Sequence, residues 1–555
     1  MQKRSRHIIV FLLSAAILVF GGCAKITAPT GGPKDTTPPK VLKTDPADGT
    51  VQFGEKHIRI YFDEFITLNN PSEKVLISPP LATSPEYLIK GKSLIIKFKD
   101  TLRANTTYNM VFSDCIKDYH EGNPQSYFHY SFSTGDSLDD YMIRGILYDA
   151  KTLAPAKDFL VMLYKGSADS LPRTTLPDYV SKSLSDGSFS LKNITAGEYR
   201  IFALKDINAN FRYDLPNEEI AFLDEPISAF RALPDSVADS LKAALPSITL
   251  MAFVAEDTVQ QLARYENPSA GLYVFPYKRH INQFSATPLS HGPEYFERIN
   301  DSRDTVFWYF KEILTDTATF VLRADDKVDT VKLSPFRASQ STGRGRTVER
   351  NVLSVKFANA GERHLPLTLQ FPYPVHPTDS FNVWLYSQHQ DHKDTACLRF
   401  AIPDTFSLQF PLPMTLAEKK SYTVMIPDSV FFGYNGLVND TLKSQFTTKS
   451  EKDYGTLIMN YQLPEDNNQY IAILQSNGKT LCSDVLTSSK TLTSSHLLPG
   501  AYLISAFCDE NGNGRWDPGD YHSKRQPEKM YVFPQEINIR AYWDSEETFK
   551  IGNSN

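Results

Sequence analysis

Hydrophobic and polar residues alternate with a period of two along most of this 555-residue chain. Residues 58–62, 94–98 and 108–112 show the alternation clearly, and Asp-Gly, Gly-Lys and Gly-Asn pairs interrupt segments of this kind. Successive side chains of a strand point to opposite faces, so the alternation predicts β-strands with one buried face and turns between them. Several such strands at short spacing are typical of a β-sandwich. Helical periodicity is rare, with residues 235–245 as the best short candidate.

The strand pattern is written twice, in two tandem units. Residues 93–134 recur without a gap at residues 407–448, and a second segment recurs farther along the chain. The matched pairs include Tyr108 and Tyr422, Phe132 and Phe446, Gly197 and Gly500, Tyr199 and Tyr502, Asp206 and Asp509, and Asn208 and Asn511. Two different modules were therefore copied together in the same order. The chain is also too long for one hydrophobic core, so we expect an all-β, multidomain protein of tandem β-sandwich domains.

Changes in composition and in the strand pattern set the expected domain boundaries. The expected units are a β-sandwich at 40–135, a smaller sandwich at 140–250, an additional β-domain at 251–337, a linker at 338–350, and second copies of the two sandwiches at 351–449 and 453–553. The linker is rich in Ser, Thr, Gly and Arg, a composition typical of exposed loops.

The first residues of the chain indicate a secretory signal. Basic residues at positions 3, 4 and 6 precede an uncharged segment, 8–20, and two glycines stand directly before Cys23. This order describes a signal peptide at residues 1–22, whose apolar segment is too short to span a bilayer. A cysteine at this place resembles a bacterial lipobox, which implies that Cys23 becomes the lipid-modified first residue of a lipoprotein. The alternative is an ordinary signal peptide that is cleaved elsewhere.

The segment after the signal peptide bears on location. Residues 23–39 are rich in Pro, Gly and Thr and are expected to form an extended spacer from the membrane. Ala24 favours the outer membrane, by analogy with lipoprotein sorting in enteric bacteria, and acyl chains are enough to anchor a folded body there. The periplasmic and the extracellular face both stay open. The net charge of −6, which becomes more negative once the signal peptide is removed, argues against a nucleic-acid partner.

Short segments of the first sandwich resemble a known family. They are Thr-Asp-Pro-Ala-Asp-Gly at 44–49, Asn-Thr-Thr-Tyr at 105–108 and Phe-Ser-Thr at 132–134. They are similar to segments of the bacterial Ig-like domain of the SbsA type, which implies an Ig-like β-sandwich. Such domains stand at the head of outer-membrane lipoproteins of the Bacteroidota, commonly after a Pro-Thr-Gly-Gly-Pro-Lys-Asp spacer like the one at 29–35.

The other repeated segments carry weaker resemblances. Through the repeat, residues 351–449 share the Ig-like resemblance, although they lack the opening Asp-Pro-Ala-Asp-Gly turn. Residues 140–250 and 453–553 resemble prealbumin-like or carboxypeptidase-regulatory-like sandwiches. That resemblance implies a role as stalks and spacers of secreted proteins.

The sharpest chemical signal lies near the C-terminus. Oxygen-bearing side chains stand at alternate positions, as in a calcium-binding loop, and Gly514 stands where that loop turns sharply. The candidate calcium ligands are Asp509, Asn511, Asn513, Arg515 through its carbonyl, Asp517 and Asp520. The alternative is a polar loop whose side chains bond to their own backbone. A bound calcium ion would have a structural role, because an ion that binds the folded state stabilises it.

The first copy carries a weaker version of this loop. Its candidate calcium ligands are Asp206, Asn208, Asn210 and Asp214. Phe211 replaces the glycine, and a side chain at such a turn is costly. Glu218 or Glu219 is a possible substitute ligand, but we expect one calcium site, in the second loop, instead of two equivalent ones.

Cysteines are few for an oxidising compartment. Cys482 and Cys508 lie in one expected domain and are candidates for a disulfide, with two reduced thiols as the alternative. Cys115 and Cys397 lie in separate copies and are expected to be small buried thiols.

The sequence carries no catalytic motif such as a His-Glu-x-x-His helix, a nucleophile elbow or a phosphate-binding loop. We therefore predict a non-enzymatic structural scaffold or adaptor lipoprotein. Its expected partner is an outer-membrane protein, either a β-barrel or its assembly or transport machinery. The alternative is a carbohydrate-binding surface lipoprotein with exposed aromatic side chains. A hydrolase of unknown type in residues 251–335 is a third hypothesis.

Overall fold

The computed structural model describes residues 35–552, apart from internal segments at 126–127, 234–236, 238–243, 257–258, 290–291, 338–352, 378–380, 390–391, 401–404 and 413. Cys23, the signal peptide, the first part of the spacer and the linker at 338–350 lie outside the described residues, as does most of the segment 235–245. Among the residues that are described, no helix has both the length and the apolarity needed to cross a membrane.

The described residues form five successive groups of β-strands, each around a hydrophobic core. By their strands these are domain 1 at 41–133, domain 2 at 141–254, domain 3 at 266–333, domain 4 at 356–447 and domain 5 at 455–550. Helix in the described residues is limited to single turns, α2 (Pro71–Lys74), α3 (Leu171–Thr174) and the 3-10 turn η1 (Glu451–Asp453). The expected fold class, all-β with tandem β-sandwich domains, is confirmed.

Domain 1 is a sandwich of antiparallel sheets. One sheet has the order β1 (Val41–Asp45), β2 (His57–Phe62), β6 (Ser93–Lys97) and β5 (Glu86–Ile89), and the other the order β4 (Val75–Ser78), β7 (Thr107–Phe112) and β9 (Phe128–Ser133). A short pair, β3 (Ile66–Leu68) with β8 (Ile116–Asp118), lies beside them. The alternation read from the sequence is realised, because Ile58, Ile60 and Phe62 point into the core while their neighbours do not.

Domain 2 is a single sheet that wraps around its core. Its main path is β12 (Tyr179–Lys182), β11 (Leu160–Tyr164), β14 (Glu198–Leu204), β15 (Glu219–Phe222), β18 (Ile248–Val254), β10 (Tyr141–Asp149) and β13 (Ser188–Ile194). The short strands β16 (Ile227–Ser228) and β17 (Phe230–Arg231) pair with β14 and β10. Strand β18 runs parallel to β10 and carries this domain to Val254, beyond the expected boundary at residue 250.

Domains 3 and 4 are sandwiches of two sheets each. In domain 3 the sheets are β19 (Glu266–Ser269), β20 (Leu272–Pro276), β23 (Thr305–Phe310) and β22 (Tyr295–Ile299), and β21 (Phe284–Pro288), β24 (Ala318–Ala324) and β25 (Lys327–Leu333). In domain 4 they are β26 (Lys356–Ala358), β27 (Leu367–Pro377) and β30 (Ser407–Leu412) with β32 (Phe431–Gly433), and β29 (His392–Phe400), β28 (Phe381–His389), β31 (Ser421–Ile426) and β33 (Leu442–Thr447). Tyr309 of domain 3 packs into the core of domain 4, so the two domains share part of one core.

Domain 5 repeats the plan of domain 2 with its strands divided between two sheets. One sheet contains β37 (Lys490–Leu497), β34 (Gly455–Gln462) and β41 (Asp544–Lys550), and the other β36 (Lys479–Leu486), β35 (Gln469–Ser476), β38 (Gly500–Asp509) and β39 (Met530–Val532), with β40 (Ile537–Ile539) paired to β38. Strands β34 and β41 run parallel, as β10 and β18 do in domain 2.

Matched residues of the repeat make matched hydrogen bonds. The hydroxyl of Tyr108 accepts from the backbone N–H of Arg103 at 2.8 Å, and that of Tyr422 accepts from Ala417 at 2.9 Å. In the second module, the hydroxyl of Tyr199 donates to a backbone carbonyl four residues earlier, and Tyr502 does the same. The repeat in the sequence is therefore a repeat of local structure.

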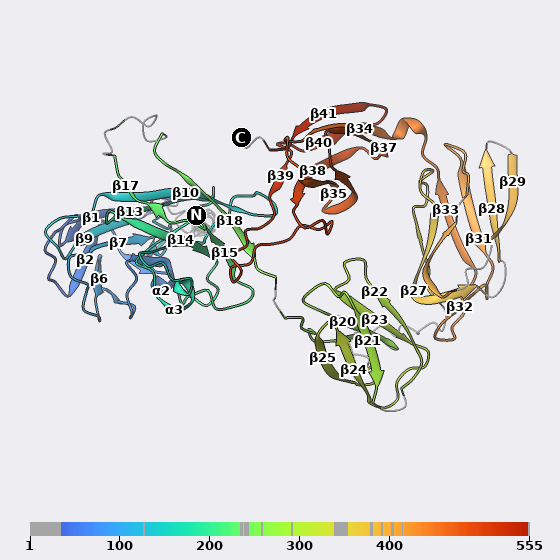
Figure 1. The fold of residues 1–555 in the computed structure, drawn as a ribbon, viewed down its shortest axis with the longest axis horizontal. Helices are drawn as coiled ribbons and strands as arrows, with labels where there is room; N and C mark the ends of the chain where they lie inside the picture. The colour runs from blue at the N-terminus through green and yellow to red at the C-terminus, as the bar shows by residue number, and fades with distance from the viewer. Residues whose placement is uncertain are drawn as a thin grey trace, which may run out of the picture.

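The domains do not form an open string. Figure 1 shows domains 1 and 2 together at the left, domain 3 below the centre, domain 4 at the right and domain 5 at the top, next to domain 2 again. The loop between β38 and β39 reaches down to β15 and β18 of domain 2, where Gln526 donates to the carbonyl of Phe222 at 3.3 Å. Domains 2 to 5 therefore close into a ring.

Candidate functional site

Residues 509–529 of domain 5, the docking loop, contain the predicted calcium ligands. Asp509 is 3% exposed, and its carboxylate accepts hydrogen bonds from three backbone N–H groups of the loop. The donors are Gly512 at 2.9 Å, Asn513 at 3.1 Å and Gly514 at 2.9 Å. Gly514 has a φ of 72°, in the left-handed region where a side chain is disfavoured. One buried carboxylate thus organises the first half of the loop.

The next predicted ligands meet at one carboxylate oxygen. The side-chain amides of Asn511 and Asn513 both donate to Oδ2 of Asp517, the second at 2.8 Å. Oδ1 of Asn513 accepts from the backbone N–H of Arg515 at 2.7 Å. The structure therefore brings the side chains of Asp509, Asn511, Asn513 and Asp517 together.

Asp520, the last of the predicted ligands, makes its hydrogen bonds outside this cluster. Its carboxylate accepts from the backbone N–H of His522 at 2.9 Å and the hydroxyl of Ser523 at 2.8 Å. The backbone of Asp520 also pairs with that of Arg525, which folds residues 520–525 into a turn of their own. The twelve-residue spacing of a calcium loop fails here because the chain leaves the loop after Asp517.

Glu528, and not Asp520, closes the loop, and the sequence analysis did not single out this residue. It is 5% exposed, and its carboxylate accepts from the backbone N–H groups of Glu510 and Asp517, both at 2.9 Å. Burial raises the pKa of Glu528, and the nearby charges of Asp517 and Asp509 raise it further. Three carboxylates therefore share this end of the domain.

The loop of the first copy has the same construction but lacks the additional residues that follow Asp517 in the docking loop. Asn208 and Asn210 donate to Asp214 at 3.0 and 2.7 Å, and the fully buried Glu218 accepts from the backbone N–H groups of Asp214 and Leu215 at 3.1 Å. Glu218 was a substitute candidate, and a comparison of the two copies that allowed an insertion after Asp517 would have found Glu528 as its counterpart.

The expected difference at Phe211 does not change the backbone. Phe211 has a φ of 59°, close to the 72° of Gly514 at the matched position of the other loop. Its backbone N–H donates to the carboxylate of Asp206 at 2.8 Å. A non-glycine residue in this region costs roughly 1 kcal/mol, which is small beside the hydrogen bonds of the loop. The two loops are therefore alike in backbone conformation at this position, and the expectation of a single calcium site stays a prediction.

These donors fit a hard cation. Carboxylates and amide oxygens are the ligands that calcium takes, and Asp509, Asp517 and Glu528 offer them in a small volume. In the structure these groups form hydrogen bonds with one another and with the loop backbone. This is the arrangement expected for a polar loop whose side chains bond to their own backbone. Calcium binding stays a prediction, with Glu528 in place of Asp520 in the ligand set.

The part of the docking loop between Asp517 and Glu528, called the excursion below, makes the contact with domain 2. Tyr521 is 4% exposed and lies edge-on to Phe202 and Phe222, with ring centroids 5.6 and 5.2 Å away. Its hydroxyl donates to the backbone carbonyl of Asp169 at 2.5 Å. These aromatic residues belong to a second apolar cluster on the outer face of domain 2, so the docking loop covers a face that the domain's own strands leave open.

Gly519 allows the close approach. A Cβ atom at this position would lie 2.4 Å from Cζ of Phe253 in domain 2. Real Cβ atoms do not lie that close to another heavy atom, so a substitution requires the loop or the Phe253 ring to shift.

Polar groups surround the aromatic contact. Lys524 lies 2.8 Å from the carboxylate of Asp169, which lowers the pKa of Asp169, and Arg200 lies 3.7 Å from the same group. Gln526 donates to Asp224 at 3.2 Å. An apolar centre with a polar rim is the usual anatomy of a specific protein interface.

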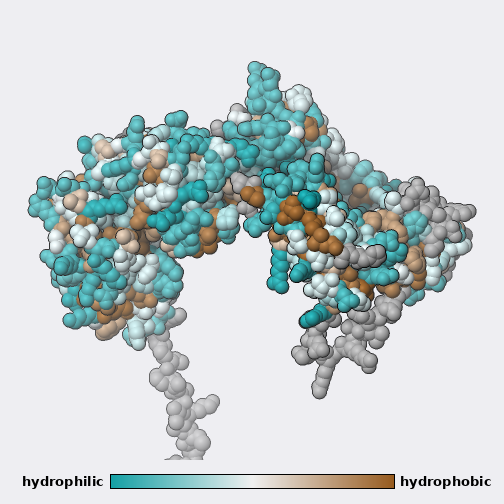
Figure 2. All heavy atoms as spheres, turned by 60° about the horizontal axis from the view of Figure 1, so that its bottom comes forward, coloured by the Kyte–Doolittle hydropathy of each residue, from teal (hydrophilic) through white to brown (hydrophobic). Residues whose placement is uncertain are grey.

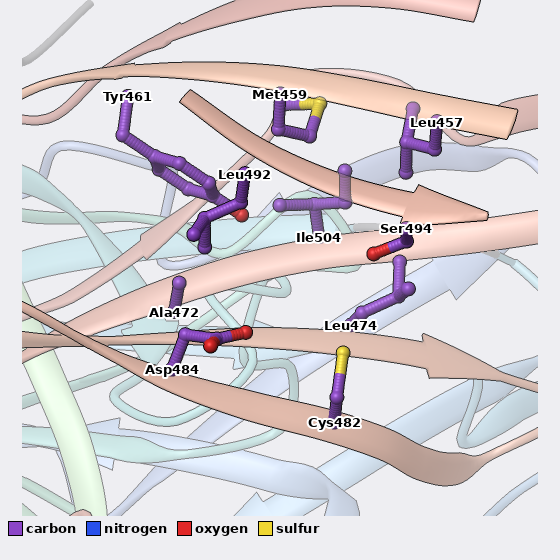
Figure 3. A pocket seen from close by; sticks show the side chains of 10 residues that line it. All are labelled: Leu457, Met459, Tyr461, Ala472, Leu474, Cys482, Asp484, Leu492, Ser494 and Ile504. Atoms are coloured by element: carbon purple, nitrogen blue, oxygen red, sulfur yellow. The ribbon is translucent and has the colours of Figure 1, made fainter. Parts of the chain in front are cut away.

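The structure has a groove at this interface and a small pocket inside domain 5. A groove of about 1110 Å³ runs between the domains and is lined by Tyr148 and Met251 of domain 2 and by Met530 and Phe549 of domain 5. Figure 3 shows the other, a small pocket between the two sheets of domain 5, where Cys482, Asp484 and Ser494 lie among apolar side chains such as Leu457 and Ile504.

The candidate disulfide is not formed, and the alternative of two reduced thiols holds. Cys482 and Cys508 are both free, the first exposed and the second buried. Cys482 on β36 pairs with Leu474 of β35, whereas Cys508 on β38 pairs with Tyr470. The cysteines are thus separated both along and across the sheet, and a disulfide needs Cα atoms within about 7 Å. Cys115 is buried as expected, but Cys397 is exposed.

The outer surface offers a few exposed aromatic residues. Figure 2 shows a face that is largely hydrophilic, with smaller hydrophobic patches between. Tyr542 and Trp543 are 71% and 64% exposed in domain 5. In domain 1, Phe65 and Tyr119 are 50% and 68% exposed, and a backbone hydrogen bond of 3.0 Å joins them.

Comparison with known proteins identifies the first domain. Residues 35–134 match the family model described as a bacterial Ig-like domain. None of the curated proteins matches the chain.

Several solved structures of β-domain proteins are similar over large parts of the chain. Native α2-macroglobulin from Escherichia coli, spanning its domains MG0-NIE-MG1, is 11% identical with a TM-score of 0.17, over 50% of this chain and 96% of that one. BcpA, the major pilin subunit of Bacillus cereus, is 9% identical with a TM-score of 0.14, over 74% of this chain and 98% of that one. The S-layer protein SbsC is 10% identical with a TM-score of 0.14, over 90% of this chain and 67% of that one.

TM-scores at this level carry no argument about the chain. The family match and the strand order together identify an all-β bacterial protein of tandem Ig-like β-sandwich domains, whose first domain, at residues 35–134, is a bacterial Ig-like domain of a kind that indicates a cell-surface or envelope protein.

Proposed function

We propose that this protein is a non-enzymatic scaffold or adaptor of the bacterial cell envelope, built to hold binding surfaces in a fixed arrangement. The observation that carries the proposal is the docking of domain 5 onto domain 2. A chain of domains joined only by linkers bends freely, whereas a ring keeps each domain in place. Fixed positions are of use to a protein that holds others together.

Polar contacts at the other junctions support the same function. Between domains 1 and 2, Asn193 donates to Asn109 at 2.8 Å, and Ser78 accepts from the backbone of Val180 at 2.9 Å. Between domains 3 and 4, Tyr373 donates to the carbonyl of Ala270 at 2.9 Å. The scaffold therefore does not depend on a single contact.

The location and partner belong to the same proposal. Lipidation of Cys23 would fix the scaffold to the outer membrane, as in Bacteroidota lipoproteins that begin with an SbsA-type domain. The partner would be an integral outer-membrane protein, either a β-barrel or its assembly or transport machinery. The spacer up to residue 39 would let the ring reach such a partner from the bilayer.

The test is crosslinking in intact cells, followed by purification of the tagged full-length protein from solubilised outer membrane. The proposal expects one or a few outer-membrane proteins in stoichiometric amounts. A Tyr521→Ala variant, in which the ring is opened, should recover less of them, and Tyr521→Phe should recover nearly as much as the unaltered protein. Recovery of this chain alone, with and without crosslinker, would contradict the proposal.

A second function is favoured by a specific observation. The exposed pair Tyr542 and Trp543 stands beside β41, and aromatic faces of this kind stack on sugar rings. A carbohydrate-binding surface protein would lose glycan-array binding on Trp543→Ala substitution. An array without signal for the unaltered protein would remove this alternative.

A further inference from the structure

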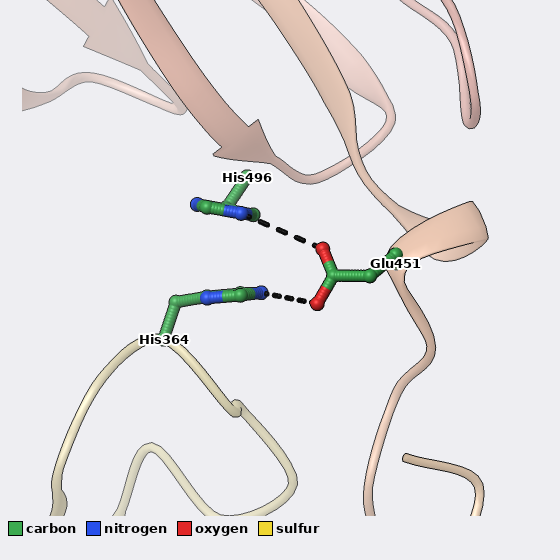
Figure 4. Close-up of side chains that lie close together, drawn as sticks. All are labelled: His364, Glu451 and His496. Atoms are coloured by element: carbon green, nitrogen blue, oxygen red, sulfur yellow. Dashed lines mark ion pairs between the residues drawn. The ribbon is translucent and has the colours of Figure 1, made fainter.

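The junction between domains 4 and 5 brings two histidines and a glutamate together. His364 lies in the loop between β26 and β27 of domain 4, Glu451 begins the turn η1 that connects the domains, and His496 lies in β37 of domain 5. Figure 4 shows both imidazole rings directed at the one carboxylate. Nε2 of His364 lies 3.2 Å from Oε1 of Glu451, and Nε2 of His496 lies 3.5 Å from Oε2. The three ligand atoms lie within 4.8 Å of one another.

These distances are those of ligands around one transition-metal ion. In a tetrahedral zinc site with bonds of about 2.0–2.1 Å, neighbouring ligand atoms are separated by roughly 3.3 Å. Two imidazole nitrogens and a carboxylate also suit zinc by type, whereas calcium and magnesium take oxygen ligands. The side chains are 29%, 52% and 40% exposed, so an ion reaches them from solvent.

The backbone of His496 is a second sign of a special position. Its φ is 58°, in the left-handed region that a residue with a side chain adopts at a cost. The matched residue of domain 2 is Asn193, with a φ of 54°, and Asn is among the residues that tolerate this region best. Asn193 bonds to Asn109 of domain 1, so both copies use this position to contact the preceding domain. The second copy alone places an imidazole there, opposite a second imidazole.

The stacking of the rings limits the affinity of the site. The ring centroids of His364 and His496 are 3.3 Å apart at an interplanar angle of 15°. Nearly parallel rings must tilt for both nitrogens to point at one ion. Arg363 also lies 2.7 Å from Oε1 of Glu451 and 3.7 Å from Glu418, so it must turn toward Glu418 when an ion binds.

We propose that His364, Glu451 and His496 form a binding site for one zinc-class divalent cation, which clamps domain 4 to domain 5. Its ligands come from both domains and from the turn between them, so a bound ion fixes their relative orientation. Three protein ligands leave a place for water on the ion. The proposal is independent of the scaffold function, because a clamp at this junction would serve any role that needs a rigid chain.

Titration of zinc into the full-length protein tests the site, in a buffer with calcium to occupy oxygen-rich loops. The expected result is one ion per chain, with binding weakened at least about tenfold by His364→Ala, Glu451→Gln or His496→Asn, since removal of a ligand costs no less than removal of its supporting hydrogen bond. His496→Asn is the matched variant, because Asn holds this backbone in domain 2. Arg363→Gln should tighten binding, and His57→Ala, at the exposed first residue of β2 in domain 1, should leave it unchanged.

Cobalt gives an independent readout, because four-coordinate Co²⁺ absorbs visible light strongly. The absorption should appear with the unaltered protein and with His57→Ala and vanish with His496→Asn, whose thermal unfolding without metal should match the unaltered protein. Zinc binding that persists in all three ligand variants overturns the proposal. So does binding that is lost only on substitution of His389 and His392, the histidines of the β28–β29 hairpin.

Discussion

The hydroxyl of Tyr521 in domain 5 donates to the backbone carbonyl of Asp169 in domain 2 at 2.5 Å, although the two residues are 352 positions apart. The ring of Tyr521 is buried against the outer face of domain 2. This contact closes domains 2 to 5 into the ring, which is called the frame below. It also gives the excursion in the second polar loop a purpose that the first loop does not have.

Removal of the Tyr521 ring should open the frame. Tyr521→Ala leaves a hole among aromatic residues, and a truncation of this size costs about 3–5 kcal/mol in a well-packed core. Small-angle X-ray scattering should report a larger radius of gyration for this variant. Tyr521→Phe, which loses only the hydrogen bond at about 1 kcal/mol, should keep the compact curve. Identical curves for Tyr521→Ala and the unaltered protein would show that the docking does not hold the frame.

Gly519 should tolerate no side chain. Gly519→Val brings its Cβ within 2.4 Å of Cζ of Phe253, so the docking loop should detach and become sensitive to limited proteolysis between residues 509 and 529. Gly54 is the matched control, since a Cβ there meets nothing within 4 Å. Gly54→Ala should behave as the unaltered protein. A protected loop in Gly519→Val would mean that β18 lies farther away than the structure places it.

Calcium should raise the unfolding temperature of the protein through the polar loops. Asp517→Asn and Glu528→Gln should reduce the stabilisation, because both remove a carboxylate from the cluster around Asp509. Asp520→Asn should leave calcium binding unchanged, because its carboxylate serves its own turn. Differential scanning calorimetry with calcium and with a chelator measures the effect. An unfolding temperature that is insensitive to both would support the purely polar loop.

The cysteines should react according to their burial. Cys397 and Cys482 are exposed and should alkylate in the native state at neutral pH, whereas Cys115 and Cys508 should react only after unfolding. Burial raises the pKa of the Cys115 thiol to about 11. A folded-state pKa above the unfolded value of about 8.5 means that the stability from this group is lost as the pH rises from about 8.5 toward 11. Peptide mapping that finds Cys482 joined to Cys508 would contradict the structure.

Replacement of Cys23 tests the membrane anchor. Cys23→Ser should remove the acyl chains, and the protein should move from the outer-membrane fraction to the soluble fraction. Metabolic labelling with a radioactive fatty acid should be lost at the same time. A Cys482→Ser variant is the control and should keep both label and location. A Cys23→Ser protein that still carries the label would mean that another residue is modified.

The elements that the sequence predicted best are those with local causes. The period-two pattern at residues 57–62 gave a strand with its alternate side chains in the core, and Tyr108 and Tyr422 make the same hydrogen bond because the same residues surround each. The first polar loop shows the limit of such reasoning. A side chain at the position of Phe211 was expected to be costly, and the turn forms with Phe211 in the left-handed region and its N–H donating to Asp206.

The missed residues depend on contacts between distant segments. Glu528 lies farther along the chain than the twelve-residue spacing of a calcium loop allows. Cys482 does not pair with Cys508 because strand β35 lies between the strands that carry them. In the sequence, nothing distinguishes Tyr521 from the other aromatic residues of a β-protein. His364 and His496 lie in different domains and far apart in the chain, so no motif linked them.

The strands, the two tandem units and the polar loops follow from the order of the residues, because side-chain alternation and turn residues act over a few positions. Which surfaces meet does not follow from that order: the docking loop packs on domain 2, and the two histidines meet Glu451 between domains 4 and 5. Such contacts depend on how folded domains are oriented to one another, and the orientation results from packing and close approach over the whole chain. Gly519 is an example, since only the position of Phe253 makes it necessary.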